Sequence, residues 1–301
     1  MNLISLFSNP KNIAIGLLHH APFIKDDLYL RIKYRLEMGE KLNLKKPIKF
    51  QEKLQWLKLY NRQPEYTKLV DKYAVKEYVK DLIGEKHVIP TLGVWNNFDE
   101  IDFEKLPDKF VLKTTHGGGS SGVIICRDKN SFDYALAKKK LQKSLRSDIY
   151  KIYKEWPYKD VPKRIIAEKY IDAPDNNGLK DYKFFCFNGE PKFLKVDSNR
   201  FTTHRANYYD LEWNLLPFGE RVFPPDTSNV DLPPIQLQEM IRLAQELSKN
   251  HPFLRVDLYN VSGNIYFGEL TFYPASGFGK FTSDEWEIKI GDILNISNFM
   301  A

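Results

Sequence analysis

A glycine-rich loop joins two predicted strands in the stretch Lys113-Thr114-Thr115-His116-Gly117-Gly118-Gly119-Ser120-Ser121-Gly122-Val123. The flanking residues 109–115 and 123–127 are rich in apolar and β-branched side chains, as strands are. A strand after the loop excludes a dinucleotide-binding turn and a nucleophile elbow, since both require a helix there. A P-loop is also excluded, because Val123 stands where that motif needs lysine. What remains is a glycine hairpin preceded by a lysine.

This loop has the chemistry of a phosphate-binding site. Glycines let backbone N–H groups approach phosphate oxygens closely, and Ser120 and Ser121 add hydroxyl donors. Lys113 can place its ammonium on the same oxygens, where a charge-assisted hydrogen bond contributes about 1.5–3 kcal/mol. An ordinary glycine-rich β-turn fits the same residues, so both interpretations stay open on this motif alone. A protein kinase is disfavoured, because its lysine follows the glycine hairpin and the sequence lacks His-Arg-Asp and Asp-Phe-Gly motifs.

Two acidic residues interrupt apolar strands near the end of the chain. Asp257 lies in the predicted strand 253–259 and Glu269 in 264–270, and the tight turn at residues 262–263 predicts a hairpin that brings them together. Facing carboxylates repel each other unless a cation lies between them, and Mg²⁺ favours one or two carboxylates plus phosphate oxygens. The alternative is that Asp257 pairs with Arg255 while Glu269 faces solvent. Together with the glycine loop, the pair favours a metal–nucleotide site.

The other predicted elements indicate an α+β protein with antiparallel sheets. Apolar spacing predicts helices at 27–41, 50–60, 71–83, 132–145, 235–249 and 284–294. Further strands are predicted at 164–171, 182–187 and 191–196, the last two joined by a hairpin turn at Asn188-Gly189. The stretch 198–234 is less regular.

Composition and charge limit the classes of protein to consider. Hydrophobic residues make up 43% of the 301, which argues against disorder, and the net charge of +6 is mild for this length. Nucleic-acid motifs are absent from the sequence, so nucleic acid is not an expected partner. Cys126 and Cys186 lie in apolar runs and are interpreted as reduced core residues. We expect a soluble, cytoplasmic protein with at most peripheral membrane contact through residues 29–59.

The region from residue 47 to 294 resembles the TupA-like ATP-grasp proteins, which are found among capsule and cell-wall polysaccharide biosynthesis genes. The resemblance is carried by Phe50-Gln51-Glu52-Lys53-Leu54-Gln55-Trp56-Leu57, Tyr66-Thr67-Lys68-Leu69-Val70-Asp71-Lys72-Tyr73-Ala74-Val75, Ile89-Pro90-Thr91-Leu92-Gly93-Val94-Trp95 and Gly268-Glu269-Leu270-Thr271-Phe272-Tyr273-Pro274-Ala275-Ser276-Gly277-Phe278. It implies an ATP-grasp fold at 66–300 after a helical region at 1–65. The fold would have a small subdomain (109–172) with the flap and a large subdomain (181–300) with the magnesium site.

The resemblance also implies roles for individual residues. Lys72 and Lys113 would bind phosphate under a flap of Gly117, Gly118, Gly119, Ser120, Ser121 and Gly122. The nucleotide's base and ribose would be met by Glu168, Lys169, Tyr170, Ile171, Asp181 and Lys183. Asp257 and Glu269 would hold Mg²⁺, with Thr271 where the family usually has asparagine, and Arg255 would steady the reacting carboxylate. The resemblance does not extend to substrate recognition; from their charge alone, Arg200, His204, Arg205 and Lys280 are expected to form the acceptor site for a carboxylate or uronic acid.

The implied activity is that of an ADP-forming carboxylate–amine ligase with ATP and Mg²⁺ as cofactors. A carboxylate would be activated as an acyl phosphate and joined to an amine, and the expected substrates are a uronic acid or similar carboxylate and an amino acid or amine. The partners would be small molecules, with a glycan or lipid-linked sugar as an alternative acceptor. Two other functions stay open: an ATP-dependent sugar kinase, and a nucleotide-binding scaffold without catalysis. The sequence leaves the oligomeric state undetermined.

Overall fold

A computed structural model describes residues 10–119, 122–172, 179–198, 205–228 and 230–299. The first of these ranges contains the helices α2 (Pro10–His19), α3 (Asp26–Met38), α4 (Phe50–Tyr60), α5 (Glu65–Val70) and α6 (Val75–Ile83). The middle of the chain contains β1 (Thr91–Trp95), β2 (Phe110–Thr114), β3 (Val123–Cys126), α7 (Tyr134–Leu145), α8 (Ile149–Tyr153) and β4 (Ile165–Lys169). The last part contains β5 (Asp181–Phe187), β6 (Glu190–Ser198), β7 (Arg205–Asp210), α9 (Leu237–Ser248), β8 (Phe253–Val261), β9 (Asn264–Thr271) and α10 (Asp284–Ile293).

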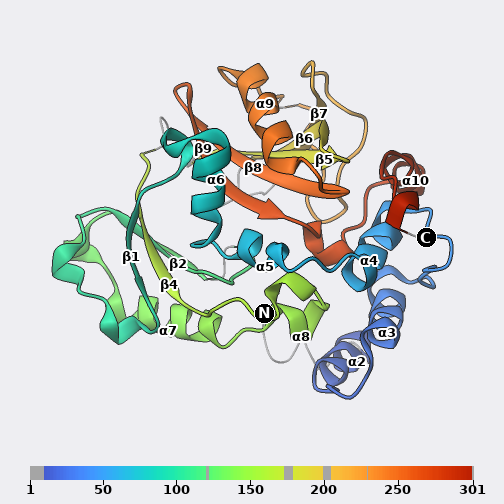
Figure 1. Cartoon of the computed structure of the whole chain (residues 1–301), viewed down its shortest axis with the longest axis horizontal. Helices are drawn as coiled ribbons and strands as arrows, with labels where there is room; N and C mark the ends of the chain where they lie inside the picture. The colour runs from blue at the N-terminus through green and yellow to red at the C-terminus, as the bar shows by residue number, and fades with distance from the viewer. Residues whose placement is uncertain (1–9, 120–121, 173–178, 199–204, 229, 300–301) are drawn as a thin grey trace.

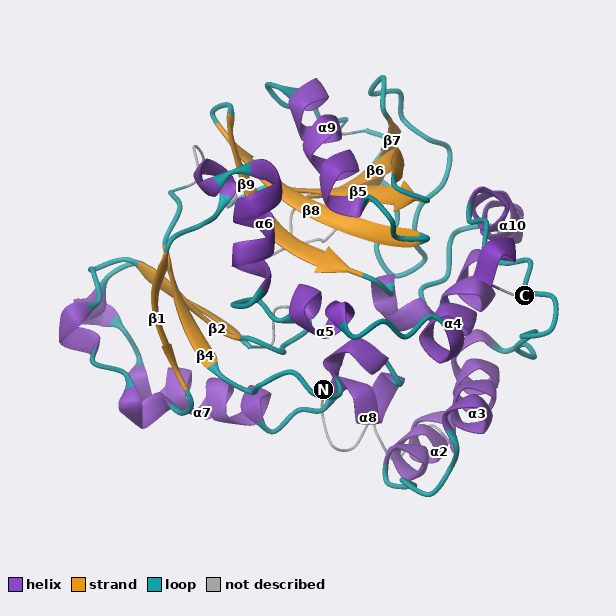
Figure 2. Cartoon of the chain, viewed as in Figure 1, coloured by secondary structure: helices purple, strands orange, loops and turns teal. Residues whose placement is uncertain are grey.

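Within the described residues, the strands form two separate antiparallel sheets (Figures 1 and 2). The small sheet has the order β1-β4-β2-β3 and the large sheet the order β7-β6-β5-β8-β9. Helix α6 lies between them in the view of Figure 1. The sheets confirm the predicted α+β class.

Helix α7 covers the small sheet. Phe110 and Leu112 of β2 are fully buried, and they share a core with Ala137 and Leu141 of α7. Their alternation along β2 matches the period of two by which a strand buries one face. The loop between β2 and β3 is thereby attached to a rigid platform.

The two faces of the large sheet differ in chemistry. Helix α9 covers one face: the Cys186 thiol of β5 donates to the carbonyl oxygen of Ala244 in α9 at 3.8 Å, and Met240 and Leu243 are fully buried. Because side chains alternate along a strand, Lys183 of β5 points to the opposite face. Asp257 is its partner in register on β8, so the charged residues gather on the face away from α9.

The N-terminal helices belong to the core of the large sheet. Tyr29, Leu30 and Tyr34 of α3 are almost fully buried in the same apolar cluster as Phe184 and Val256 of that sheet. In the described part of the chain, no helix is long and apolar enough to cross a membrane.

Several element predictions need correction. The expected helix at 71–83 begins only at Val75, because Asp71 accepts hydrogen bonds from the backbone of Tyr73 and Ala74 in a turn before it. The sequence prediction missed helix α2 and the short elements α5, α8, β1 and β7. The stretch 198–234, expected to be less regular, contains β7 as an edge strand.

Candidate active site

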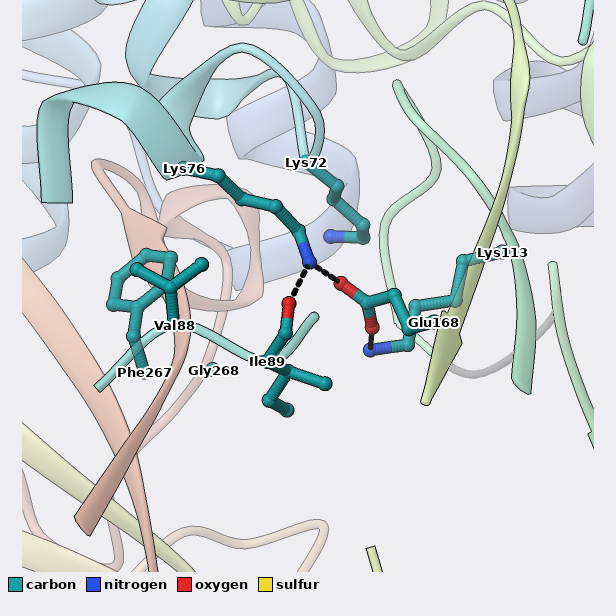
Figure 3. Close-up of a pocket in the computed structure, with 8 residues that line it drawn as sticks. All are labelled: Lys72, Lys76, Val88, Ile89, Lys113, Glu168, Phe267 and Gly268. Carbon is teal, nitrogen blue, oxygen red and sulfur yellow. Dashed lines mark hydrogen bonds and ion pairs between the residues drawn. The ribbon is translucent and has the colours of Figure 1, made fainter. Parts of the chain in front are cut away.

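A small cavity opens between the two sheets (Figure 3). Its charged wall consists of Lys72 from the turn before α6, Lys76 from α6, Lys113 from β2 and Glu168 from β4. Its remaining wall is formed by Val88, Ile89, Phe267 and Gly268. The cavity therefore has three ammonium groups on one side and apolar side chains on the other.

Glu168 links two of these lysines. Its Oε1 lies 2.5 Å from Lys76 Nζ and its Oε2 lies 2.6 Å from Lys113 Nζ. Lys76 also donates to the carbonyl oxygen of Ile89 at 2.6 Å. Burial alone would raise the pKa of Glu168, but the ammonium groups of Lys113 and Lys76 lower it to about 2. Glu168 is thus an anion at neutral pH, and it fixes both lysines at the cavity.

Lys72 connects the glycine-loop strand with the far end of the chain. Its backbone N–H donates to the carbonyl oxygen of Thr115 at 2.9 Å, and its Nζ lies 3.1 Å from Glu269 Oε2. The ion pair joins residues that are 197 positions apart. The contact therefore places Lys72, a predicted phosphate-binding residue, beside Glu269, a predicted magnesium ligand.

The predicted hairpin of acids is present. In the register of β8 and β9, Asp257 stands opposite Glu269 and Arg255 opposite Thr271. Arg255 donates two hydrogen bonds of 2.7 Å to Asp257, so the pairing expected in the alternative interpretation is present. Arg255 also donates to Glu269 at 3.0 Å. Lys72 and Arg255 hold the pKa of Glu269 well below its usual range, although burial opposes them. Burial raises the pKa of Asp257 against the pull of Arg255 and Lys183.

A second cluster continues from Asp257 across the sheet. Lys183 Nζ lies 2.7 Å from Asp181, 3.3 Å from Asp197 and 3.3 Å from Asp257, and all four side chains are buried. Sequence reasoning missed Asp197 here and Lys76 in the cavity. The charges at every second position in Asp181-x-Lys183 and Lys195-x-Asp197 mark one charged strand face, and this was the available signal for Asp197.

The glycine loop lies against α7. A Cβ atom at Gly122 would come within 2.3 Å of Ser144 Oγ and 2.7 Å of Thr114 Oγ1, two hydroxyls that are hydrogen-bonded to each other. Glycine is therefore required at 122 for the loop to return to β3. Gly117, Gly118 and Gly119 precede it, and Gly119 has a positive φ of 64°. Ser120 and Ser121 lie outside the described residues.

The predicted base-binding residues run along the end of β4. The backbone N–H of Lys169 donates to the carbonyl oxygen of Pro90, its side chain is exposed, and the Tyr170 ring lies 5.7 Å from Lys109 Nζ. Ile171 follows the end of the strand. Contact of Lys169, Tyr170 and Ile171 with a base stays a prediction.

Two of the four predicted acceptor residues lie among the residues that the structure describes. Arg200 and His204 lie outside the described residues, and Arg205 begins the edge strand β7. The ammonium of Lys280 donates to the carbonyl oxygen of Met38 at 2.6 Å, which ties it to the end of α3. Recognition of an acceptor by these residues stays a prediction.

The donor set at the hairpin suits a hard cation. Asp257 Oδ2, Glu269 Oε1 and Thr271 Oγ1 all lie within 3.0 Å of one atom, Arg255 Nη2, so their oxygens already surround one cationic point. Oxygen donors are what Mg²⁺ prefers. Across the described ranges, no group of three or more His, Cys, Asp and Glu side chains could hold a metal ion, which leaves this set with two carboxylates and a hydroxyl.

A family model described as TupA-like ATPgrasp matches residues 52–295. The chain belongs to this family. Its two antiparallel sheets with the N-terminal helices are accordingly the ATP-grasp fold. No curated protein matches the chain.

Several solved ATP-grasp structures are similar to this TupA-like chain. D-alanine–D-alanine ligase from Bacillus anthracis, complexed with ATP, is 17% identical with a TM-score of 0.41, and the match covers 75% of this chain and 63% of the ligase. ATP-grasp ligase PsnB, with its minimal precursor, Mg and ADP, is 10% identical with a TM-score of 0.41 over 97% of this chain and 75% of PsnB. A RimK domain ATP-grasp protein from Sphaerobacter thermophilus is 11% identical with a TM-score of 0.41, covering 78% of this chain and 70% of that protein. The chain thus spans less than two thirds of the length of the Bacillus ligase.

Proposed function

We propose that this TupA-like protein is an ADP-forming carboxylate–amine ligase that activates a carboxylate as an acyl phosphate. The observation that carries the proposal is the contact between Lys72 and Glu269, 3.1 Å apart. It joins the lysines beside the glycine loop to the pair of acids on the large sheet. A triphosphate needs cations on one side and a metal held by carboxylates on the other, and the cleft offers both.

The lysines and the loop have the first role in the proposal. Lys113 and Lys72 would bind phosphate oxygens and offset the charge that develops during phosphoryl transfer. The backbone N–H groups of Gly117 to Gly122 would cover the same oxygens from above and keep water out. Positioning and charge stabilisation suffice for this chemistry, so no nucleophilic serine or cysteine is required.

The large sheet has the second role. Asp257, Glu269 and Thr271 would hold Mg²⁺, which would neutralise charge on the phosphates. Arg255, two residues before Asp257 on β8, would orient the reacting carboxylate and stabilise the oxyanion when the amine attacks. Asp181 would face the ribose hydroxyls, with Lys183 holding its carboxylate in place.

The substrate class rests on charge. A uronic acid or similar carboxylate joined to an amino acid or amine suits the cationic side of the cleft, and such a product would serve surface polysaccharide synthesis in the cytoplasm. A glycan or lipid-linked sugar would be the larger alternative acceptor.

The deciding experiment measures ADP and phosphate release with a matrix of uronic acids and amino acids. A ligase releases both only when carboxylate and amine are present together. Stable transfer of labelled γ-phosphate to a sugar would identify a kinase instead. Stabilisation by Mg-ATP without turnover on any mixture would identify a scaffold.

Two substitutions link the activity to the acids. Asp257→Asn and Glu269→Gln should abolish turnover, because each removes a charged metal donor and leaves the strand pairing intact. Glu190→Gln, at the exposed first residue of β6 in the same sheet, is the control and should retain full activity. Full activity in Asp257→Asn or Glu269→Gln would refute the metal assignment.

A further inference from the structure

The guanidinium of Arg255 occupies the centre of the proposed metal ligands. Its Nη2 atom is 2.7 Å from Asp257 Oδ2 and 3.0 Å from both Glu269 Oε1 and Thr271 Oγ1. Its Nε atom is 2.7 Å from Asp257 Oδ1. Oxygens of three different residues therefore converge on one nitrogen.

We infer that Arg255 is a resident cation that holds the metal position in the metal-free protein and withdraws when a divalent ion enters. This inference rests on the proposed function, because it concerns the same carboxylates. It adds a step that the donor set alone does not imply, namely an exchange of one cation for another.

A resident cation is needed because the carboxylates face each other. Asp257 and Glu269 are directly opposite in register, and like charges in that position repel. The Asp257 side chain is 3% exposed, so water screens it little. Arginine cannot lose its proton in a protein, which makes it a dependable counter-charge.

Each carboxylate also contacts a lysine, Lys72 on Glu269 and Lys183 on Asp257. Lys72 contacts Glu269 at Oε2, the oxygen away from Arg255, at 3.1 Å. Lys183 lies 3.3 Å from Asp257 Oδ2. Since each carboxylate keeps its contact with a lysine when Arg255 leaves, part of the negative charge of the pair stays balanced during the exchange.

Metal and guanidinium exclude each other at this point. Mg²⁺ binds oxygen ligands, and the three oxygens that would hold it are the ones that Nη2 now contacts. Two cations cannot share that position.

Once withdrawn, the guanidinium has its planar set of donors available for another anionic oxygen, and carboxylate is the group that it matches in geometry. Metal entry would thereby prepare Arg255 for the carboxylate substrate, and by linkage each would favour the other.

The exchange can be tested by titrating the protein with free Mn²⁺ and following its electron paramagnetic resonance signal, without nucleotide. Arg255→Met removes the competing charge and keeps a similar bulk. It should bind Mn²⁺ roughly tenfold or more tightly than the wild type, because the ion no longer displaces a cation. Arg255→Gln, also neutral, should give the same gain and serves if the methionine variant does not fold. Arg242→Met, an exposed arginine of α9, is the matched control and should bind as the wild type does.

The outcomes separate this inference from the proposed function. A gain in Arg255→Met that disappears in the double variant with Asp257→Asn supports the exchange. If the wild type binds Mn²⁺ with ATP, but Arg255→Met and Arg255→Gln bind free Mn²⁺ no more tightly than the wild type, the exchange is overturned and the metal site stands. If none of the proteins binds Mn²⁺ with or without ATP, the proposed function falls as well.

Discussion

Glu168 shows how one buried carboxylate organises the cavity. It receives Lys76 and Lys113 on separate oxygens, so neither lysine is free to turn into solvent. Burying a charge costs several kcal/mol unless partners of opposite sign compensate, and here two do. The arrangement holds the ammonium groups at the wall where phosphate binding is proposed.

We predict that Glu168→Gln lowers the free energy of unfolding at pH 7 by about 3 kcal/mol, since it leaves two partly buried lysines without their shared anion. The folded-state pKa of Glu168 is lowered from 4.5 to about 2, so the ionised carboxylate stabilises the fold fully above pH 4.5. This contribution is lost as the pH falls toward 2. Urea unfolding of both proteins between pH 2.5 and 7 should show a difference that shrinks below pH 4.5.

A control acid tests whether burial is the cause. Glu190 pairs with Lys192 on the surface, and Glu190→Gln should change stability far less. An equal loss in the two variants, or a Glu168→Gln deficit that does not depend on pH, would contradict this account.

At the scale of elements, α4 organises the loop that follows β9. One stripe of the helix carries Gln51, Gln55 and Lys58, which donate to backbone carbonyl oxygens of residues 276, 277 and 279. The loop contains two non-glycine residues with positive φ, Ala275 and Ser276, a conformation that costs roughly 1–2 kcal/mol per residue. The helix therefore compensates for strain beside the strand that carries the acids.

Gln55→Leu should lower the free energy of unfolding by about 2 kcal/mol, because the buried hydrogen bond to the Gly277 carbonyl oxygen and the partly buried one to Ser276 are both lost. The measurement is chemical denaturation. Gln142→Leu, on α7 at the other sheet, should change stability by less than about 0.5 kcal/mol. A loss no larger for Gln55→Leu than for Gln142→Leu would show that the stripe does not hold the loop.

Two glycines in helices allow the effect of tight packing on stability to be compared with the effect of intrinsic helix propensity. A Cβ atom at Gly291 of α10 would come within 2.1 Å of the carbonyl oxygen of Ile48, so Gly291→Ala should push α10 off the start of α4 and destabilise the protein by about 2 kcal/mol. Gly16 of α2 has open space around it, and Gly16→Ala should raise stability by about 0.5–1 kcal/mol. Thermal melts of both variants should move in opposite directions, and a gain in Gly291→Ala would contradict the contact.

The sequence predicts long and regular elements better than edges. Residues 50–60 and the hairpin of β8 and β9 were predicted within one or two residues, because their apolar spacing and turn residues agree with the final packing. Strand β1 was missed since it is short, contains Gly93 and shows no alternation of burial. Lys76 was missed because a lysine on an amphipathic helix is typical of a solvent face. Only the tertiary fold brings β4 and Glu168 against it.

At the scale of the whole molecule, two apolar cores flank the cleft. One lies under the large sheet and the N-terminal helices, and the other lies between the small sheet and α7. Lys113 comes from the small sheet and Glu269 from the large one, so a ligand that contacts both sides stabilises each against the other.

We expect Mg-ATP at one hundred times its Kd to stabilise the protein by about 2.7 kcal/mol, seen as a higher Tm. Lys113→Ala should need a higher concentration of Mg-ATP for the same shift, because it loses a charge-assisted contact with phosphate. Lys138→Ala, an exposed lysine of α7, is the control. An unchanged ATP dependence in Lys113→Ala would place the nucleotide elsewhere.

The burial of Tyr29 and Tyr34 has a practical consequence for protein engineering. The family match begins at residue 52, yet these two rings from α3 are part of the cluster that includes the large sheet. A truncated protein that begins at the family match would lack α3 and expose the apolar side chains that α3 covers. Such a fragment should collect in inclusion bodies instead of yielding a soluble, folded domain.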